Sequence, residues 1–168
     1  MTKSDQREQI RLALAELTTG QRAEKSAQIR EKAAEELENA ASVMAFVPTR
    51  GEPDIAQLFA GRAAAYPCTG PDGTMEAVEP TAWTQGRFGI PEPAEGRTVP
   101  PEELDLVFVP LTAFDEKNRR LGRGGGYYDN YLKRCVRARK VGVAFAEQKL
   151  DEVVTDDYDV RLDAVLYA

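Results

Sequence analysis

Residues 119–134, with the sequence RRLGRGGGYYDNYLKR, place four arginines, four glycines and three tyrosines in one short stretch. A glycine run such as Gly124–Gly126 allows backbone conformations that other residues avoid, so its amides can approach a ligand closely. Amides at the start of a following helix face the same ligand, and the helix dipole there favours an anion. Arg120 and Arg123 add forked donors that match phosphate oxygens. The stretch therefore predicts a binding site for a small phosphorylated molecule.

Two common phosphate-binding motifs do not match this stretch. A Walker loop requires Gly-Lys followed by Ser or Thr, which the chain lacks. A dinucleotide-binding fingerprint beginning at Gly122 requires glycine at its sixth position, where Tyr127 stands. Asp129 follows in the first turns of the expected helix, where a carboxylate can hold Mg²⁺ against the same phosphates. The alternative is a solvent-exposed glycine turn before a capped helix, but the arginines, the tyrosine pair and Asp129 favour phosphate binding.

The composition narrows the available chemistry. The 168-residue chain has a formal net charge of -6 and no histidine, which excludes Ser-His-Asp and Cys-His nucleophiles and His-ligated zinc. An acidic chain is not typical of nucleic-acid binders, so the local basic cluster suits a small anionic ligand. Cys68 and Cys135 are too few for a disulfide framework and indicate a reducing cytoplasm. No stretch has the length needed to cross a bilayer, so we expect a cytoplasmic protein without nucleic-acid or membrane partners. We also expect it to be a monomer.

Hydrophobic patterns predict alternating helices and strands. Apolar residues at helical spacing predict a helix over residues 5–17, and Thr18 with Gln21 forms a capping box for a second helix that ends near residue 39. Residues 105–110 form the clearest strand, because they are continuously apolar and branched. The remaining expected elements are strands at 42–48, 63–67, 74–78, 140–145 and 163–167, and helices at 54–61 and 127–136.

This alternation predicts an α/β fold. We expect a single three-layer domain over residues 1–168, in which helices cover both faces of a central, largely parallel or mixed sheet. The segment from Pro80 to Pro101 is rich in proline and glycine, and we expect it to form a long ordered loop.

Residues 109–134, VPLTAFDEKNRRLGRGGGYYDNYLKR, resemble the signature of the 5-formyltetrahydrofolate cyclo-ligase family, also called methenyltetrahydrofolate synthetase. That signature is an apolar strand ending in Val-Pro, then Ala-Phe-Asp, then Arg-Leu-Gly, a basic or aromatic residue, and Gly-x-Gly-Tyr-Tyr-Asp. The resemblance spans nearly the whole chain. Further matching segments are REQIR (7–11), RGEPDI (50–55), GRFGIPEP (86–93), VGVAFAEQ (141–148) and DYDVRLDAV (157–165).

The resemblance implies an ATP- and Mg²⁺-dependent ring closure of 5-formyltetrahydrofolate to 5,10-methenyltetrahydrofolate, with release of ADP and phosphate. The γ-phosphoryl group is transferred to the formyl oxygen, N10 attacks the activated carbon, and phosphate departs. No enzyme nucleophile is required, which agrees with the absence of histidine. Two alternatives remain: a relative that binds nucleotide and folate as a regulatory module, and an ATP-dependent enzyme that acts on another folate or pterin.

The resemblance assigns ATP-binding roles to two parts of the chain. Arg7 and Arg11, four residues apart on one helix face, would meet the ATP phosphates, and Arg7 stands where the family usually has lysine. Their spacing alone also fits an ordinary solvated helix face. The implied ATP-binding loop consists of Arg120, Leu121, Gly122, Arg123, Gly124, Gly125, Gly126, Tyr127 and Tyr128.

The same resemblance assigns catalytic and metal-binding roles. Arg123 and Tyr127 would act in catalysis, with Arg123 stabilising charge that develops during phosphoryl transfer. Asp129 would be a Mg²⁺ ligand, with Asp159 as its distant partner. Arg119, just upstream of the loop, is expected to face solvent and to be silent when changed to alanine.

The implied folate contacts are Val47, Glu52, Phe88 and Tyr127. Glu52 would accept hydrogen bonds from the aminopyrimidine edge of the pterin; without the resemblance it would be interpreted as a surface residue in a Gly-Pro turn. Phe88 would lie against the folate rings, and core packing under a long loop is an equally good interpretation.

Overall fold

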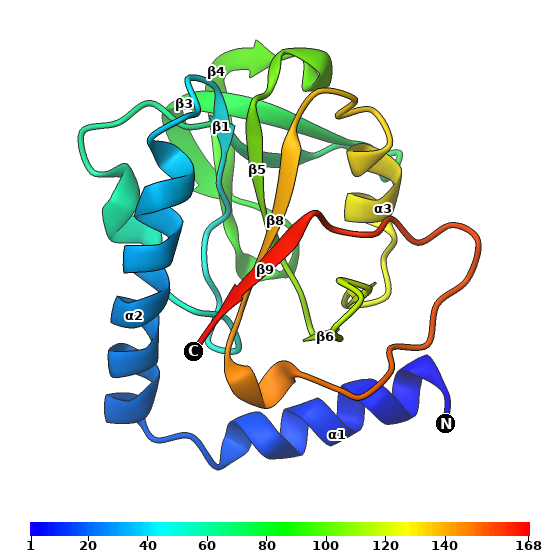
Figure 1. Cartoon of the computed structure of the whole chain (residues 1–168). Helices are drawn as coiled ribbons and strands as arrows, with labels where there is room; N and C mark the ends of the chain where they lie inside the picture. Colours follow the sequence, from blue (N-terminus) through cyan, green and yellow to red (C-terminus); the bar gives the residue numbers. More distant parts are fainter.

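A computed structural model describes residues 1–168, and its centre is a four-stranded parallel sheet with the strand order β1-β5-β8-β9 (Figure 1). The pairs β1–β5, β5–β8 and β8–β9 are all parallel. β5 was predicted to be a buried middle strand, and it lies between β1 and β8. The four strands are β1 (Val43–Met44), β5 (Leu106–Pro110), β8 (Arg139–Ala144) and β9 (Ala164–Tyr167).

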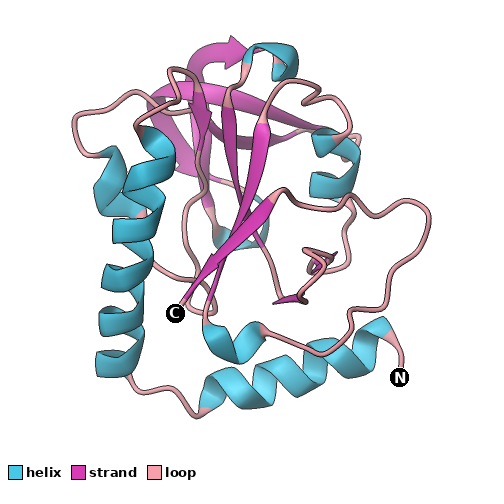
Figure 2. Ribbon diagram, viewed as in Figure 1, coloured by secondary structure: helices cyan, strands magenta, loops and turns pink.

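Helix α2 (Thr19–Leu37) covers one face of this sheet (Figure 2). Its Ile29 and Ala33 are fully buried, and they belong to the same hydrophobic cluster as Leu106 and Phe108 of β5. Residues two apart in a strand point to the same face, so these two β5 side chains both meet α2. Burial of this apolar stripe fixes the helix on the sheet.

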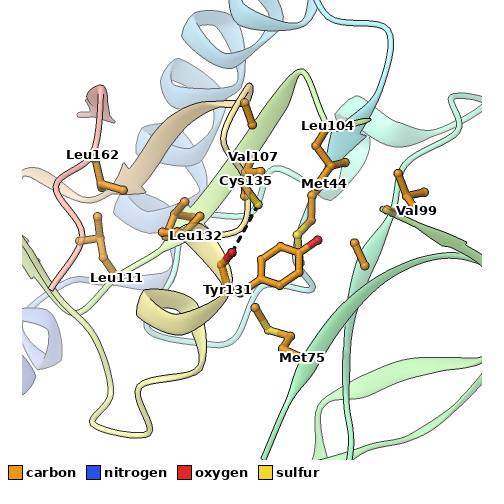
Figure 3. Packing of buried hydrophobic residues seen from close by; sticks show 14 of the residues in the cluster. Met44, Met75, Val99, Leu104, Val107, Leu111, Tyr131, Leu132, Cys135 and Leu162 are labelled. Carbon is orange, nitrogen blue, oxygen red and sulfur yellow. Dashed lines mark hydrogen bonds between the residues drawn. The ribbon is translucent and has the colours of Figure 1, made fainter. Parts of the chain in front are cut away.

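The short helix α3 (Tyr127–Leu132) lies on the opposite face (Figure 3). Its Tyr131 and Leu132 are buried in a second cluster with Val107 and Val109, the β5 residues that point away from α2. Helices on both faces of a parallel sheet confirm the predicted three-layer α/β arrangement. The glycine-rich loop enters α3 directly, so this packing also anchors the loop.

Helix α1 (Lys3–Ala15) runs along the lower edge of the molecule in Figure 1. Its Ile10 is buried in a third cluster with Leu121. Leu121 belongs to a small antiparallel sheet formed by β6 (Ala113–Phe114) and β7 (Arg120–Leu121). This contact places the first turns of α1 beside the strand that leads into the glycine-rich loop.

The prediction of a long loop from Pro80 to Pro101 was wrong. The segment forms most of an antiparallel hairpin between β3 (Met75–Gln85) and β4 (Pro91–Val99), and β2 (Tyr66–Thr69) pairs with the other edge of β3. Pro80 is followed by a register shift, and β4 is an edge strand, so these prolines occupy positions that a sheet tolerates. Proline content therefore misled the prediction.

Other boundaries differ by smaller amounts. The predicted strand 42–48 pairs only at β1, the predicted helix 54–61 is a 3-10 helix η1 (Ala56–Phe59), and α3 is shorter than 127–136. The capping box of α2 is confirmed by reciprocal Thr18–Gln21 hydrogen bonds of 3.1 and 2.9 Å. None of the helices is both long and apolar enough to span a bilayer. The remaining 3-10 helices are η2 (Arg87–Gly89), η3 (Pro101–Glu103) and η4 (Ala146–Gln148).

Candidate functional site

A cavity of about 800 Å³ lies where the glycine-rich loop, the start of α1, the tip of the β3–β4 hairpin and the segment around residues 156–159 meet. Thr49 and Glu52, which follow β1, and Leu111, which follows β5, line it. Ligands of parallel α/β sheets bind outside the carboxyl ends of the strands, and this cavity has that position. Its volume suits small-molecule ligands.

The glycine-rich loop forms one wall of the cavity with its backbone. Gly124 and Gly126 have φ angles of 111° and 72°, a region that favours glycine. A Cβ atom on Gly125 would lie 2.7 Å from the ring of Tyr127. The amides of residues 122–126 donate no backbone hydrogen bond, and no side chain caps α3. The loop therefore presents free donors, although α3 has only 6 residues and adds less dipole than predicted.

Arg120 fixes this loop to the floor of the cavity. Its side chain is 5% exposed, donates from Nη1 to Asp129 Oδ1 at 3.1 Å, and donates from Nε to the Pro110 carbonyl at 3.2 Å. The guanidinium also lies 5.5 Å from the ring centroid of Tyr128. Burial lowers the pKa of Arg120, and the Asp129 carboxylate opposes that shift. Such a buried, paired arginine holds the shape of the loop.

Arg123 joins the loop to the opposite wall. Its Nη2 donates to Glu52 Oε1 and to Thr49 Oγ1, both at 2.6 Å. The Glu52 side chain is 6% exposed, whereas that of Arg123 is 52% exposed. Glu52 Oε2 also accepts from Thr49 N at 2.8 Å. The structure therefore places Glu52 inside the cavity and pairs it with the arginine predicted to act on phosphate.

Of the predicted basic pair on α1, the structure brings only Arg7 to the cavity. Arg7 Nε donates to the Gly122 carbonyl at 2.8 Å. Arg11 is 65% exposed, pairs with Glu8 at 2.6 Å and lies outside the cavity. Lys3, four residues before Arg7, lines the cavity instead. The predicted ATP contact of Arg11 stays a prediction, and the spacing of the pair alone gave no means to tell which basic side chains of α1 line the cavity.

Asp129 and Asp159 line the cavity, but each is already engaged through one oxygen. Asp129 Oδ1 accepts from Arg120 and from Val160 N at 3.1 Å, and Asp159 Oδ2 accepts from Lys3 Nζ at 2.7 Å. Burial lowers the pKa of Lys3, but its hydrogen bonds to Asp159 and Asp156 outweigh burial and leave that pKa raised. No three His, Cys, Asp or Glu side chains gather as a metal site. Because Mg²⁺ commonly takes one or two carboxylates plus phosphate oxygens and water, the pair fits Mg²⁺ bound together with a nucleotide.

The aromatic residues differ in their surroundings. Phe88 is 81% exposed at the hairpin tip, with a φ of 61°, so the core-packing interpretation was wrong. Tyr127 lines the cavity, and its hydroxyl accepts from Arg87 Nη1 at 2.8 Å. The Tyr128 hydroxyl is buried without a hydrogen-bond partner, and burial raises its pKa. Val47 forms part of the cavity wall.

Arg119 does not face solvent, contrary to the prediction. Its side chain is 17% exposed, and Nε donates to Asp115 Oδ2 at 2.6 Å. Its Nη1 also pairs with Glu152 at 3.0 Å. The Asp115 side chain is 1% exposed, so Arg119 neutralises a buried carboxylate.

Sequence reasoning missed Lys3, Thr49, Arg87 and Glu92, all of which line the cavity. Arg87 and Glu92 belong to GRFGIPEP, a quoted segment from which only Phe88 was selected. The available signal was a basic residue beside an aromatic residue, between Gly86 and Gly89. Thr49 carried none, because its contact with Arg123 joins residues 74 positions apart.

Comparisons with known proteins agree on one family. The chain matches the sequence model of the 5-formyltetrahydrofolate cyclo-ligase family over residues 1–168. It is 42% identical over 89 residues to 5-formyltetrahydrofolate cyclo-ligase of Mus musculus, covering 48% of this chain and 44% of that protein. The Haemophilus influenzae protein of that name is 40% identical over 90 residues, covering 51% and 48%. The chain thus spans about half the length of the curated relatives it matches.

Two solved structures resemble the whole chain. The 5,10-methenyltetrahydrofolate synthetase of Mycoplasma pneumoniae has a TM-score of 0.83 at 26% identity, covering 99% of this chain and 98% of that one. The Aquifex aeolicus 5,10-methenyltetrahydrofolate synthetase, solved by NMR, has a TM-score of 0.88 at 31% identity, covering 99% and 90%.

Proposed function

Because the chain belongs to the 5-formyltetrahydrofolate cyclo-ligase family, we propose that it catalyses the ATP- and Mg²⁺-dependent cyclisation of 5-formyltetrahydrofolate to 5,10-methenyltetrahydrofolate, with release of ADP and phosphate. One observation carries this proposal. A buried carboxylate suited to a pterin, Glu52, and a backbone cradle suited to phosphate open into the same cavity, and Arg123 spans the two.

The reaction requires a poor leaving group to be activated. The N5-formyl group is an amide, and its oxygen leaves readily only after phosphorylation. ATP supplies the γ-phosphoryl group, N10 attacks the activated carbon, and phosphate carries the oxygen away. Since substrate atoms act as acceptor and nucleophile, the protein has to position the two substrates and stabilise the charge on the transferring group.

The phosphate end of the cavity supplies positive charge and amide donors. Arg7 lies beside Gly124, Lys3 lies one helical turn away, and the amides of residues 122–126 are free. Asp129 and Asp159 would hold Mg²⁺ through the carboxylate oxygens that accept no hydrogen bond in the protein. When bound, Mg²⁺ neutralises charge on the phosphoryl group. The basic cluster on this acidic chain thereby meets the negative charge of ATP.

The folate end depends on Glu52. Its carboxylate can accept two hydrogen bonds from the aminopyrimidine edge of a pterin, which presents donors at that spacing. In the free protein Arg123 and Thr49 occupy those oxygens. Leaving a buried carboxylate unpaired is costly, so Arg123 is released to the phosphoryl group as the pterin replaces it on Glu52. This exchange of partners links folate binding to completion of the phosphate site.

The decisive experiment is direct formation of the methenyl chromophore. Purified protein is mixed with 5-formyltetrahydrofolate and ATP, and absorbance is followed with Mg²⁺ and with EDTA. We expect product only when ATP and Mg²⁺ are both present. Binding of both ligands by calorimetry without product would favour the regulatory relative, and turnover of another folate or pterin in its place would favour the second alternative.

We further propose that residues 1–168 act as a single-domain monomer in the cytoplasm. The parallel sheet combines β1, β5, β8 and β9, which come from both halves of the chain. Helix α1 contacts a segment near the other end of the sequence, since Lys3 pairs with Asp156 and Asp159. Cys68 and Cys135 are free thiols, which suits a reducing compartment. Light scattering of the purified chain gives its mass in solution, and a dimer mass would contradict the monomer.

A further inference from the structure

Arg87, at the tip of the β3–β4 hairpin, is a cation without an acidic partner. It lines the cavity, it is exposed, and its Nη1 donates to the neutral Tyr127 hydroxyl at 2.8 Å. Arg120 and Arg123 line the same cavity, but both are paired with carboxylates. On a chain with 28 acidic residues, an arginine held at a cavity by an uncharged group is available for an anionic ligand.

The position of Arg87 distinguishes it from the phosphate cradle. Arg7, the other cavity arginine without a carboxylate partner, contacts the glycine-rich loop through the Gly122 carbonyl. Arg87 instead comes from the tip of the β3–β4 hairpin and stands next to Phe88, which is 81% exposed. The cavity therefore has a second cationic point at its open side, beside a flat apolar surface.

The shape of a folate matches this arrangement. Its pterin, aminobenzoyl ring and glutamate follow one another in an elongated molecule, with the anionic glutamate at the end away from the pterin. Glu52, the proposed pterin acceptor, is 8% exposed, so it marks the closed side of the cavity. A folate bound there by its pterin extends its glutamate toward the open side, where the hairpin tip lies.

We propose that Arg87 binds the glutamate carboxylates of the folate substrate, with Phe88 covering the aminobenzoyl ring; this rests on the proposed function. An arginine fork pairs with a carboxylate through two parallel hydrogen bonds. The Tyr127 hydroxyl orients the guanidinium from one side. Phe88 and Gly89 both have left-handed φ angles, 61° and 71°. For Phe88 this conformation is costly, and costly backbone conformations cluster at ligand-binding sites.

The test removes the Arg87 guanidinium and the glutamate carboxylates of the substrate separately. Wild type and Arg87→Ala are assayed with 5-formyltetrahydrofolate and with 5-formyltetrahydropteroyl amide, in which a neutral carboxamide replaces the glutamate. We expect Arg87→Ala to raise KM for 5-formyltetrahydrofolate about three- to tenfold at low ionic strength, with kcat nearly unchanged. KM for the amide should not change, and added salt should reduce the difference for the natural substrate.

Arg97→Ala is the matched control. Arg97 lies on the same hairpin and pairs with Glu79 at 2.8 Å, but it does not line the cavity. It should alter neither KM, and Arg87→Lys should recover part of the loss because the charge is kept. An equal rise in KM for both folates, or a rise in KM for ATP alone, would overturn the proposal. If wild type turned over neither folate, the proposed function would fail, and the same comparison by binding calorimetry would still decide the role of Arg87.

Discussion

At the scale of single residues, Arg123 is the proposed catalytic side chain with the most specific contacts, to Glu52 and Thr49. It is half exposed and paired with a buried carboxylate, and in the proposed function its guanidinium leaves Glu52 once a pterin replaces it. A contact made only as charge develops lowers kcat and kcat/KM together when it is removed. We expect Arg123→Ala to reduce kcat by about 100-fold with saturating substrates. Arg123→Lys should recover only part, because a point charge does not reproduce the fork.

Arg119→Ala was expected to be silent, but it cannot serve as the control for Arg123→Ala because Arg119 neutralises the buried Asp115 carboxylate. Arg97→Ala serves, since its side chain is 63% exposed and pairs only with Glu79. Steady-state kinetics of both variants separate the cases. If Arg123→Ala raised KM for ATP and left kcat unchanged, Arg123 would contribute uniform binding and no stabilisation of the transition state.

The residues that line the cavity were predictable where they form one continuous stretch of sequence. The glycine-rich loop could be identified because its glycines, arginines and tyrosines are adjacent in the sequence. Residues 120–130 all line one cavity, whereas Arg119 does not. The Glu52–Arg123 pair joins residues 71 positions apart, and no local pattern encodes it. Phe88 shows the same limit, because only the fold reveals that the ring is exposed.

At the scale of elements, Asp115 ties the β6–β7 hairpin to the chain that follows η4. Its Oδ1 accepts from the amides of Lys117 and Arg119, and its Oδ2 accepts from Arg119 Nε and Val153 N. Burial raises the pKa of Asp115, but these hydrogen bonds outweigh it and leave the pKa below its usual value of 3.8. Asp115→Asn replaces an acceptor with a donor, so we expect a loss of about 1–3 kcal/mol in the free energy of unfolding at pH 7.

The sign of the pH dependence follows from the lowered pKa. A depressed carboxyl pKa stabilises the folded state above the unfolded pKa, and this stabilisation disappears as pH falls through the folded pKa. The difference between wild type and Asp115→Asn should therefore be constant near neutrality and should narrow below pH about 4. Urea unfolding at several pH values measures it. A difference independent of pH down to about 2 would show that the charge of Asp115 has no part in the effect.

The type of secondary structure was predictable for buried segments, but the prediction failed for the β3–β4 hairpin. β5 could be identified because a strand covered on both faces is continuously apolar. The hairpin carries Pro80, Pro91 and Pro93, and composition alone predicts a loop there. Its strands are stable because proline falls at a register shift and on an edge strand, which depends on the pairing partner.

At the scale of the whole molecule, the two ends of the chain close the cavity. Lys3, in the first turn of α1, pairs with Asp156 at 2.9 Å and with Asp159 at 2.7 Å. The parallel sheet and its flanking helices were predictable from alternation. The closure was not, because it depends on how α1 lies against the small β6–β7 sheet, and the sequence alone therefore did not show that Lys3 lines the cavity and Arg11 does not.

We propose that Lys3 both ties α1 to residues 156–159 and contacts the phosphates of ATP, and a single substitution separates the two roles. Its pKa is raised, so its ion pairs contribute stability below the unfolded value of 10.5 and lose it only as pH rises through the folded pKa. At pH 7 we expect Lys3→Met to lower the melting temperature of the free protein slightly, because partly exposed pairs contribute little. Loss of a phosphate contact should raise the Kd for Mg·ATP about three- to tenfold, which removes about 0.6–1.4 kcal/mol of ligand-induced stabilisation.

Lys149→Met provides the comparison, because Lys149 also forms an ion pair, with Glu116 at 3.1 Å, but lies outside the cavity. Thermal unfolding of wild type and both variants is measured without Mg·ATP and at one Mg·ATP concentration that saturates the wild type. The rise in melting temperature should be smaller for Lys3→Met and unchanged for Lys149→Met. Equal rises in all three proteins would mean that Lys3 only ties the two ends of the chain together, and that the phosphate charge is met by Arg7 and the glycine-rich loop.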